Sequence, residues 1–434
     1  MTAPDQTRRN PDPDVTLHRP MSAAGAPQWA GATWIGVLDL AELDPALRRA
    51  AGGEALCAVP AADGYRRARI LIRHGRRPMR FVDAEIDEGR VRVPLPPDPA
   101  VVAEPVRSAA QLPPVSVVLC TRERPADLRG ALASLLDVDY PDFEIIVVDN
   151  AAVTDGTQRV VAEFDDPRVR RIVEPVAGLS SARNAGLWAA RHGIVAYTDD
   201  DVVADPGWLR GLALGFTRSD DVACVCGMVP SGELRTVPQA YFDWRVSWAD
   251  NLESRVYSLT EPPTDVPLFP FQVGLYGTGA NFAVRRETAI ALGAFDRRLG
   301  AGTRTRGGED LDMFFRVLAA GHALATEPSS IIWHRHRADD DALLWQARGY
   351  GIGLGAWLTK VALTREHRRL ALSVLRRRLR AVATAGMAYG TIAAPPPEFL
   401  RSVPKSVGRV EVLSVLHGPR TLWQETRRQR RKQL

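Results

Sequence analysis

The sequence predicts an α/β protein with a doubly wound, mostly parallel sheet, preceded by an all-β domain and followed by a helical extension. Two observations predict the sheet. From residue 115, apolar runs alternate with helical patterns across short connections, as in repeated strand–helix units. The runs themselves, such as "VSVVLC" and "FEIIVVDN", are continuous and rich in β-branched residues, which is typical of strands buried on both faces.

Length and composition indicate a globular chain of two or three domains. The chain has 434 residues, 45% of them hydrophobic and 25% charged, and chains of this length usually form more than one core. The sequence has no apolar run long enough to predict a membrane span, and its N-terminus lacks the apolar segment of a secretion signal. We therefore expect a cytoplasmic protein with reduced cysteines, in which Cys224 and Cys226 are buried strand residues rather than a metal site.

Five regions are predicted along the chain. Residues 1–27 are expected to be a disordered tail, and residues 28–100 an all-β domain, because "YRRARILIR" and "MRFVDAEI" alternate on either side of a turn. Residues 101–114 are predicted to be a proline-rich linker, residues 115–340 the α/β domain, and residues 341–434 a basic helical extension.

Within the α/β domain, strands and helices are expected to alternate. The predicted strands cover 115–120, 143–150, 169–175, 193–201 and 221–229, and the predicted helices cover 124–137, 154–164, 178–192, 206–216 and 309–321. The aromatic- and proline-rich stretch 230–280 interrupts this rhythm, so we expect it to be an irregular binding loop.

Polar residues follow three of the expected strands. Thr121 ends the first, Asp149-Asn150 the second, and Asp199-Asp200-Asp201 the fourth. Because ligands bind beyond the carboxyl ends of parallel strands, these ends should meet in one crevice. Asp199 and Asp201 point the same way in an extended chain, and paired carboxylates suit Mg²⁺ or Mn²⁺, the ions that accompany diphosphates. The alternative is an acidic first turn of a helix.

Five segments in this region carry a family resemblance: "PPVSVVLCTRERPADL", "FEIIVVDN", "GLSSARNAGL", "TDDD" and "GGEDLDMFFRVLAAG". In their order and spacing, residues 113–336 resemble the family 2 inverting glycosyltransferases, which have the GT-A fold. The resemblance implies a nucleotide-sugar donor and places its contacts at Thr121, Arg124, Asp149, Arg183, Asp199 and Asp200, with Asp149 reading the base. Arg122-Glu123 depart from the aromatic residue and asparagine usual after Thr121.

The chemistry of sugar transfer requires the same residue types. A cation held by Asp199 and Asp201 would neutralise the departing diphosphate. A carboxylate must take the proton of the acceptor hydroxyl, and Asp310, at a helix start after Gly307-Gly308, is predicted to be this base. Such a base attacks nothing itself, so the displacement is single and inverts the anomeric configuration. Glu309 is predicted to hold the acceptor or orient the loop; both acids also fit a helix N-terminus.

A third metal ligand is predicted at His334 in "IIWHRHR", with His336 as its rival. Imidazole is a common ligand of transition metals, and family members with such a histidine carry it after a tryptophan at about this distance from the Glu-Asp motif. The alternative is a structural histidine.

The contacts to the donor sugar and the acceptor are assigned to Gly279, Asn281 and Trp244. Gly279 and Asn281 lie in "YGTGANFAVRRE", which resembles the part of the fold where donor sugar and acceptor meet; a simple tight turn is the alternative. Trp244 and Trp248, four residues apart, could stack on a sugar or pack in a core.

The net charge of +5 is unevenly distributed. Residues 365–380 carry seven arginines and one acid, and residues 425–434 carry five basic residues and one acid. This pattern favours peripheral contact with an anionic membrane at its inner face, where lipid-linked glycan acceptors would be met, or else a solvated helical surface. No nucleic-acid partner is expected, because no nucleic-acid-binding module is recognisable in the sequence.

The sequence therefore predicts a metal-dependent hexosyltransferase that uses Mn²⁺ or Mg²⁺. UDP- or dTDP-sugars are favoured, because a carboxylate at 149 can accept from uracil or thymine N3–H, with GDP as the alternative. The acceptor is expected to be a glycan, a lipid-linked molecule or a small molecule. A nucleotidyltransferase would need a glycine-rich, lysine-bearing loop that "TRERPAD" lacks. An inactive glycan- or nucleotide-binding module is the alternative from another class.

Overall fold

The computed structural model describes residues 13–45, 53–96, 112–246, 248–385, 403 and 406–433. The chain divides into two compact units, Met1–Val106 with Glu233–Thr236, and Arg107–Gly232 with Val237–Leu434. The boundary between them falls inside the predicted linker 101–114, of which residues 101–111 lie outside the described part.

The smaller unit is built from two three-stranded sheets. They contain β1 (Val15–Thr16), β3 (Glu54–Ala58) and β6 (Arg90–Pro94), and β2 (Thr33–Asp39), β4 (Arg67–His74) and β5 (Arg77–Glu85), with a short 3-10 turn, η1 (Leu40–Glu42), after β2. The apolar alternation in β4 packs as expected, because Ala68, Ile70 and Ile72 all lie in the core between the sheets.

The prediction of a disordered tail over residues 1–27 is wrong for residues 13–27. Val15–Thr16 pair in parallel with Cys57–Ala58 of β3, and Leu17 and Met21 are only 2% exposed. Burial of these apolar side chains removes area from water and favours the folded segment. The apolar stretch is too short to be recognised from its pattern. Residues 1–12 lie outside the described part.

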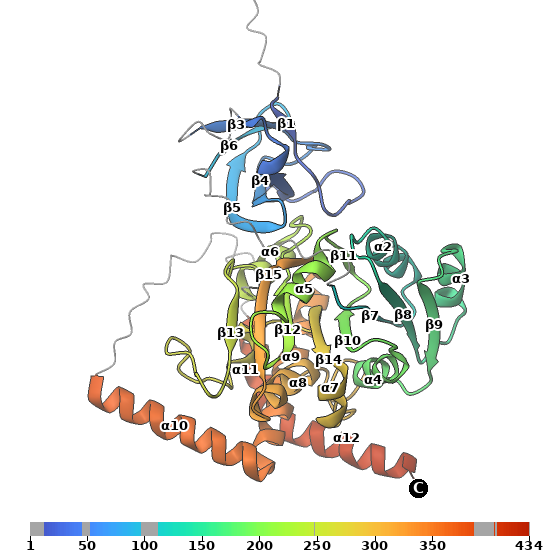
Figure 1. The fold of residues 1–434 in the computed structure, drawn as a ribbon, viewed down its shortest axis with the longest axis vertical. Helices are drawn as coiled ribbons and strands as arrows, with labels where there is room; N and C mark the ends of the chain where they lie inside the picture. Colours follow the sequence, from blue (N-terminus) through green and yellow to red (C-terminus); the bar gives the residue numbers. More distant parts are fainter. Residues whose placement is uncertain are drawn as a thin grey trace, which may run out of the picture. The chain divides into compact units, whose positions relative to one another are not determined.

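The larger unit contains a nine-stranded sheet among its described residues, in the order β11-β15-β12-β14-β10-β7-β8-β9, with β13 also paired to β15 (Figure 1). Its strands are β7 (Val115–Thr121), β8 (Phe143–Asn150), β9 (Val169–Glu174), β10 (Ile194–Thr198), β11 (Val202–Ala204), β12 (Val222–Met228), β13 (Arg255–Tyr257), β14 (Asn281–Arg285) and β15 (Ala323–His334). The strands β9, β8, β7 and β10 run parallel, whereas β14 is antiparallel to β10 and β12. The predicted α/β fold with a parallel-rich sheet is confirmed.

Helices cover both faces of this sheet. One face carries α2 (Pro125–Leu136), α3 (Gly156–Glu163) and α5 (Trp208–Gly215), and the other carries α4 (Leu179–Ala189), α7 (Arg286–Ala291), α8 (Glu309–Ala319) and α9 (Asp340–Leu363). The alternation of side chains along each strand divides the two layers. In β7, Val117 and Leu119 pack with the leucines of α2, whereas Val118 packs with α4.

The expected irregular loop over residues 230–280 is wrong for 237–246, which form α6 (Val237–Val246). Its Phe242 packs with Leu343 and Ala347 of α9, so contacts more than a hundred residues away stabilise a helix that its own weak periodicity does not indicate. The rest of the stretch contributes β13 and a 3-10 turn, η3 (Val273–Leu275).

The predicted helical extension is present and consists of α9, α10 (Arg365–Ala385), α11 (Ser406–Val415) and α12 (Gly418–Gln433) (Figure 1). These helices belong to the same compact unit as the sheet. Lys360 of α9 contacts both Asp296 and Asp312 at 2.8 Å, which ties α9 to α8 and the preceding loop. Among the helices described, none combines the length and hydropathy needed to span a membrane.

Candidate functional site

The carboxyl ends of neighbouring strands bring the predicted acids together. Thr121 of β7 and Asp149 of β8 are in register, and Thr198 at the end of β10 pairs with Leu119 of β7. Strand order reverses here, because β8 lies on one side of β7 and β10 on the other. The turn after β10 therefore projects its three aspartates into the position where ligands bind in open α/β sheets.

Asp200, the middle of the three aspartates, forms hydrogen bonds with other side chains of the protein. Its two oxygens accept hydrogen bonds from Thr121 Oγ1 at 2.7 Å and Arg124 Nη1 at 2.6 Å. Burial nevertheless raises the pKa of Asp200 to about 6. The hydroxyl of Thr121 and the guanidinium of Arg124 thus hold this turn in place.

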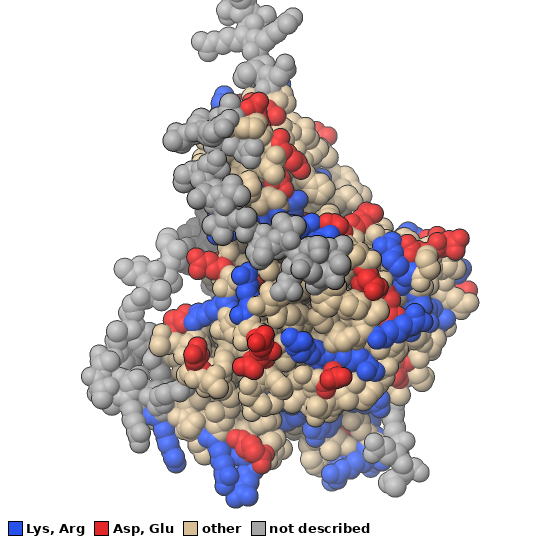
Figure 2. All heavy atoms as spheres, in the orientation of Figure 1, with Lys and Arg blue, Asp and Glu red and all other residues tan. Residues whose placement is uncertain are grey.

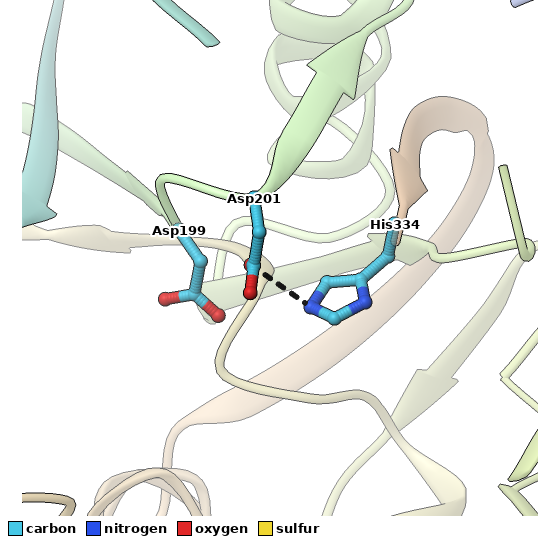
Figure 3. Close-up of side chains that lie close together, drawn as sticks. All are labelled: Asp199, Asp201 and His334. Carbon is cyan, nitrogen blue, oxygen red and sulfur yellow. Dashed lines mark ion pairs between the residues drawn. The ribbon is translucent and has the colours of Figure 1, made fainter. Parts of the chain in front are cut away.

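Asp199, Asp201 and His334 form a group that could hold a metal ion (Figure 3). Each offers one ligand atom, and these atoms all lie within 4.8 Å of one another. The pairing of β11 with β15 creates this group, because Val202, which follows Asp201, lies opposite His334. Two carboxylates and an imidazole are a donor set that fits Mn²⁺, and the oxygens also suit Mg²⁺.

The two candidate histidines have different positions. His334 Nε2 lies 3.3 Å from Asp201 Oδ1, whereas His334 Nδ1 lies 3.2 Å from His336 Nδ1. His336 is buried against the ring of Phe242, and this burial lowers its pKa, which favours a neutral ring whose Nδ1 can accept a hydrogen bond from His334 Nδ1–H. Although burial opposes it, Asp201 raises the pKa of His334, which favours a proton on Nε2 in the ion pair with Asp201. An ion that replaced this proton would find the Nε2 lone pair facing the acids, with Nδ1–H bonded to His336.

Glu309 and Asp310 begin α8, after Gly308 in the left-handed conformation at φ 90°. Glu309 is buried and its Oε1 lies 3.1 Å from Arg183 Nη1. Burial and the nearby charge of Asp310 raise the pKa of Glu309. Asp310 Oδ2 instead accepts the N–H of Gly279 at 2.9 Å, and its other oxygen accepts the N–H of Leu311. The two acids therefore have different environments.

Arg183 is an interior residue of this site rather than a surface residue of α4. It is 2% exposed, donates to the carbonyl of Gly279 at 2.9 Å and lies 3.7 Å from Asp199 Oδ1. A Cβ added at Gly279 would come within 2.7 Å of Arg183 Nη2, so the guanidinium would have to shift from its present position. Arg183 thus connects the metal-fitting group, Gly279 and Glu309.

Replacing Arg183 by Met should lower the free energy of unfolding of the larger unit by about 3–5 kcal/mol, because it leaves Glu309 buried without its partner. Chemical denaturation followed by tryptophan fluorescence would measure the loss. In the double variant Arg183→Met/Glu309→Gln part of the stability should return, since the unpaired charge is gone. A loss below about 1 kcal/mol in the single variant would contradict this role.

Two cavities meet at these residues. The acid cavity, of about 500 Å³, is lined by Asp199, Asp200, Asp201 and His334 together with Thr121 and Arg124. The aromatic cavity, of about 720 Å³, is lined by Asp310 and Gly279 together with Phe242, Trp248, Phe271 and Trp357. Asp199 lines both cavities, so molecules bound in each would meet beside it.

Glycines in α9 position the loop that carries Asp310, and sequence analysis missed them. A Cβ added at Gly353 would lie 2.7 Å from the backbone of Gly307. A Cβ added at Gly308 would lie 2.7 Å from the carbonyl oxygen of Gly353. On another face of α9, Gly351 and Gly355 touch the backbone of α11. The spacing Gly349-x-x-x-Gly353 was the available signal, since small residues four apart on a helix permit close backbone contact.

Three predicted contact residues do not face either cavity. Asn281 is fully buried, and its side chain bonds to Trp208 Nε1 and to the carbonyls of Met228 and Ser330. Trp244 is about half exposed on α6 and lines neither cavity, whereas Trp248 lines both. Asp149 is fully buried, with Oδ2 accepting from Arg171 at 2.9 Å.

Comparison with known proteins gives consistent matches over this region. Residues 116–292 match the family model described as Glycosyl transferase family 2. The chain is similar to the pre-mycofactocin glycosyltransferase of Mycobacterium tuberculosis, at 29% identity over 226 residues, 51% of this chain and 43% of that protein. It is also similar to the succinoglycan biosynthesis protein ExoM of Rhizobium meliloti, at 27% identity over 241 residues, 54% of this chain and 71% of that protein.

One solved structure shows a weaker likeness. The mannosyltransferase PcManGT from Pyrobaculum calidifontis, in complex with GDP-Man and Mn²⁺, is 20% identical with a TM-score of 0.47, covering 72% of this chain and 88% of that chain. The match to the mycobacterial relative spans less than half of that protein's length.

Proposed function

Because residues 116–292 form a family 2 glycosyltransferase domain, we propose that the protein transfers a sugar from a nucleotide-diphosphate sugar to an acceptor hydroxyl, with inversion. One observation carries this proposal: Asp199 lines both the acid cavity, which contains the metal-fitting group, and the aromatic cavity, which contains Asp310. A donor held in the first cavity and an acceptor held in the second would meet beside Asp199, as transfer requires.

The donor diphosphate belongs in the acid cavity. Asp199, Asp201 and His334 would hold Mn²⁺ or Mg²⁺, which when bound supplies positive charge for the departing diphosphate. Four arginines also line this cavity and favour an anionic ligand: Arg122, Arg124, Arg306 and Arg337.

UDP or dTDP stays the favoured nucleotide, with GDP as the alternative. Asp149 could accept from the base only after its pair with Arg171 opens, because the carboxylate is fully buried in this structure. Its neighbour Asn150 lines the acid cavity, with its side-chain amide bonded to the backbone of Glu174, Val176 and Gly178.

Asp310 is proposed as the general base. Its carboxylate accepts hydrogen bonds from the N–H groups of Gly279 and Leu311 in the first turn of α8, and these bonds fix its orientation. Its side chain lines the aromatic cavity, where it would accept the proton of the acceptor hydroxyl. The acceptor oxygen then bonds to the anomeric carbon as the bond to the diphosphate breaks on the opposite face, which inverts the configuration.

Glu309 is proposed to position this acid rather than to react. Its carboxylate is paired with Arg183, which in turn binds the carbonyl of Gly279, the residue that donates to Asp310. An inactive binding module is disfavoured, because the base and the metal-fitting group are both present.

A donor screen tests the proposed function. The full chain would be incubated with UDP-, dTDP- and GDP-sugars and Mn²⁺, and nucleotide release would be measured with and without hydroxyl acceptors. We expect release with one base class, faster when an acceptor is present. If no sugar nucleotide bound and none released its nucleotide, the proposal would be wrong.

We also propose peripheral contact between the C-terminal helices and an anionic membrane surface. Figure 2 shows Lys and Arg side chains gathered over α10 and α12. On and just after α11, Val412, Leu413 and Leu416 are 69%, 59% and 76% exposed. Exposed apolar side chains near basic helices fit the boundary between lipid headgroups and acyl chains.

The double variant Leu413→Gln/Leu416→Gln should bind anionic vesicles more weakly than the natural protein, because it loses the apolar part of this surface. Co-flotation with vesicles of phosphatidylserine and phosphatidylcholine, at low and high salt, would measure it. Truncation at residue 341 is unsuitable, since it removes α9 from the larger unit. Equal flotation of the natural and variant proteins would contradict the proposal.

A further inference from the structure

We propose that the acceptor is amphipathic: an apolar group, joined to the part that carries the reacting hydroxyl, packs in the aromatic cavity. This inference rests on the proposed function and names the acceptor class of the same site. The apolar group is alkyl, as in a lipid, or aryl, as in a small aromatic molecule, and both share the chemistry that the cavity recognises.

The walls of the aromatic cavity are mostly apolar. Aromatic side chains come from α6 (Phe242), from the chain before η3 (Phe271) and from α9 (Tyr350 and Trp357). Leu275, Leu343 and Leu354 add aliphatic surface. Its volume of about 720 Å³ lies in the range of about 300–1,000 Å³ typical of sites that enclose a whole small ligand. The cavity therefore has room for an apolar group beyond the atoms that react at Asp310.

The charged side chains of this cavity are largely paired with one another. Arg183 is bonded to Glu309, and Arg245 Nη2 lies 2.7 Å from Glu411 Oε1. A glycan with many hydroxyls needs many free donors and acceptors, because each buried hydroxyl without a partner costs free energy. Apart from Asp199, Asp310 and Arg306, the charged side chains here are paired and offer few such partners, which favours an acceptor with an apolar body.

Part of the apolar lining remains in contact with water in this structure. Leu275 is 54% exposed, Tyr350 41% and Leu354 37%, although all three line the cavity. A ligand that covers these side chains gains the free energy of removing apolar surface from water. The exposed lining is thus the surface that an apolar group of the acceptor would cover.

The first test measures binding, so it does not depend on turnover. Trp248 and Trp357 line the cavity, so intrinsic fluorescence should report occupancy. The full chain, with UDP and Mn²⁺, would be titrated with methyl, octyl and phenyl glycosides of the same sugars. We expect octyl or phenyl glycosides to bind at least about tenfold more tightly than methyl glycosides; stronger octyl binding indicates a lipid acceptor and stronger phenyl binding an aromatic one. Equal affinity for all three would overturn the inference.

Two leucines of α9 provide a matched pair of variants. Leu354, 37% exposed, lines the cavity, whereas Leu358, 40% exposed and one turn later, does not. Leu354→Gln should weaken binding of the preferred apolar glycoside about tenfold, and Leu358→Gln should leave it unchanged. Equal effects of the two variants would contradict the inference. Absence of nucleotide release from every donor in the natural protein would instead contradict the proposed function, independently of these affinities.

Discussion

Asp310→Asn should lower the turnover of sugar transfer by about 10²- to 10⁴-fold, the usual cost of removing a positioned general base. The amide keeps the shape of the carboxylate and can still accept the N–H of Gly279, so the loop and α8 should remain folded. Donor affinity should change little, because Asp310 lines the aromatic cavity and not the acid cavity. Steady-state kinetics and calorimetry with the nucleotide would measure the two quantities.

Asp340→Asn is the matched control for this variant. Asp340 also lies in the first turn of a helix, α9, but it is exposed and lines neither cavity. The Asp340→Asn variant therefore measures the effect of losing a carboxylate near a helix N-terminus without any change in the cavities. Its turnover should equal that of the natural protein. The anomeric configuration of the product, measured by NMR coupling constants, should be inverted. Full turnover in Asp310→Asn, or a product that retains configuration, would sink the mechanism.

Removal of divalent ions should abolish transfer, and added Mn²⁺ or Mg²⁺ should restore it, because the departing diphosphate would otherwise lack its counter-charge. Mn²⁺ binding can be measured by EPR without any turnover. In Asp201→Asn the affinity for Mn²⁺ should fall by more than about 100-fold, since loss of even an outer partner of a ligand costs about 10- to 100-fold.

Asp200→Asn is the matched control for metal binding. The Asp200 oxygens are bonded to Thr121 and Arg124 and lie outside the metal-fitting group, so this variant should lose far less affinity for Mn²⁺ than Asp201→Asn. Undiminished transfer in metal-free buffer with EDTA would refute the metal hypothesis. So would equal Mn²⁺ affinities in Asp200→Asn and Asp201→Asn.

The sequence alone could predict the main strands, the helices around them and the acids that follow β10. The pattern that identifies each of them lies within a few neighbouring residues of the chain. Composition predicts buried strands such as β8, and apolar periodicity predicts the helix α8. Asp199 and Asp201 are two residues apart, so their common direction follows from local geometry. His334 was reached through the family resemblance, and the structure places it, rather than His336, beside these acids.

Only the tertiary structure decided which of the other candidates face the site, because burial depends on contacts between residues distant in sequence. Arg183 could have been a surface residue of α4 until its pairing with Glu309, 126 positions away, became visible. Asn281 and Trp244 were both predicted to contact a sugar, yet interior hydrogen bonds occupy the first, and the second lies on α6 and lines neither cavity. The sequence by itself determined the strands, the helices and the acids at the ends of the strands. The packing of α6, α8 and α9 around Asp310 determined the aromatic cavity, because the walls of this cavity come from several segments of the chain.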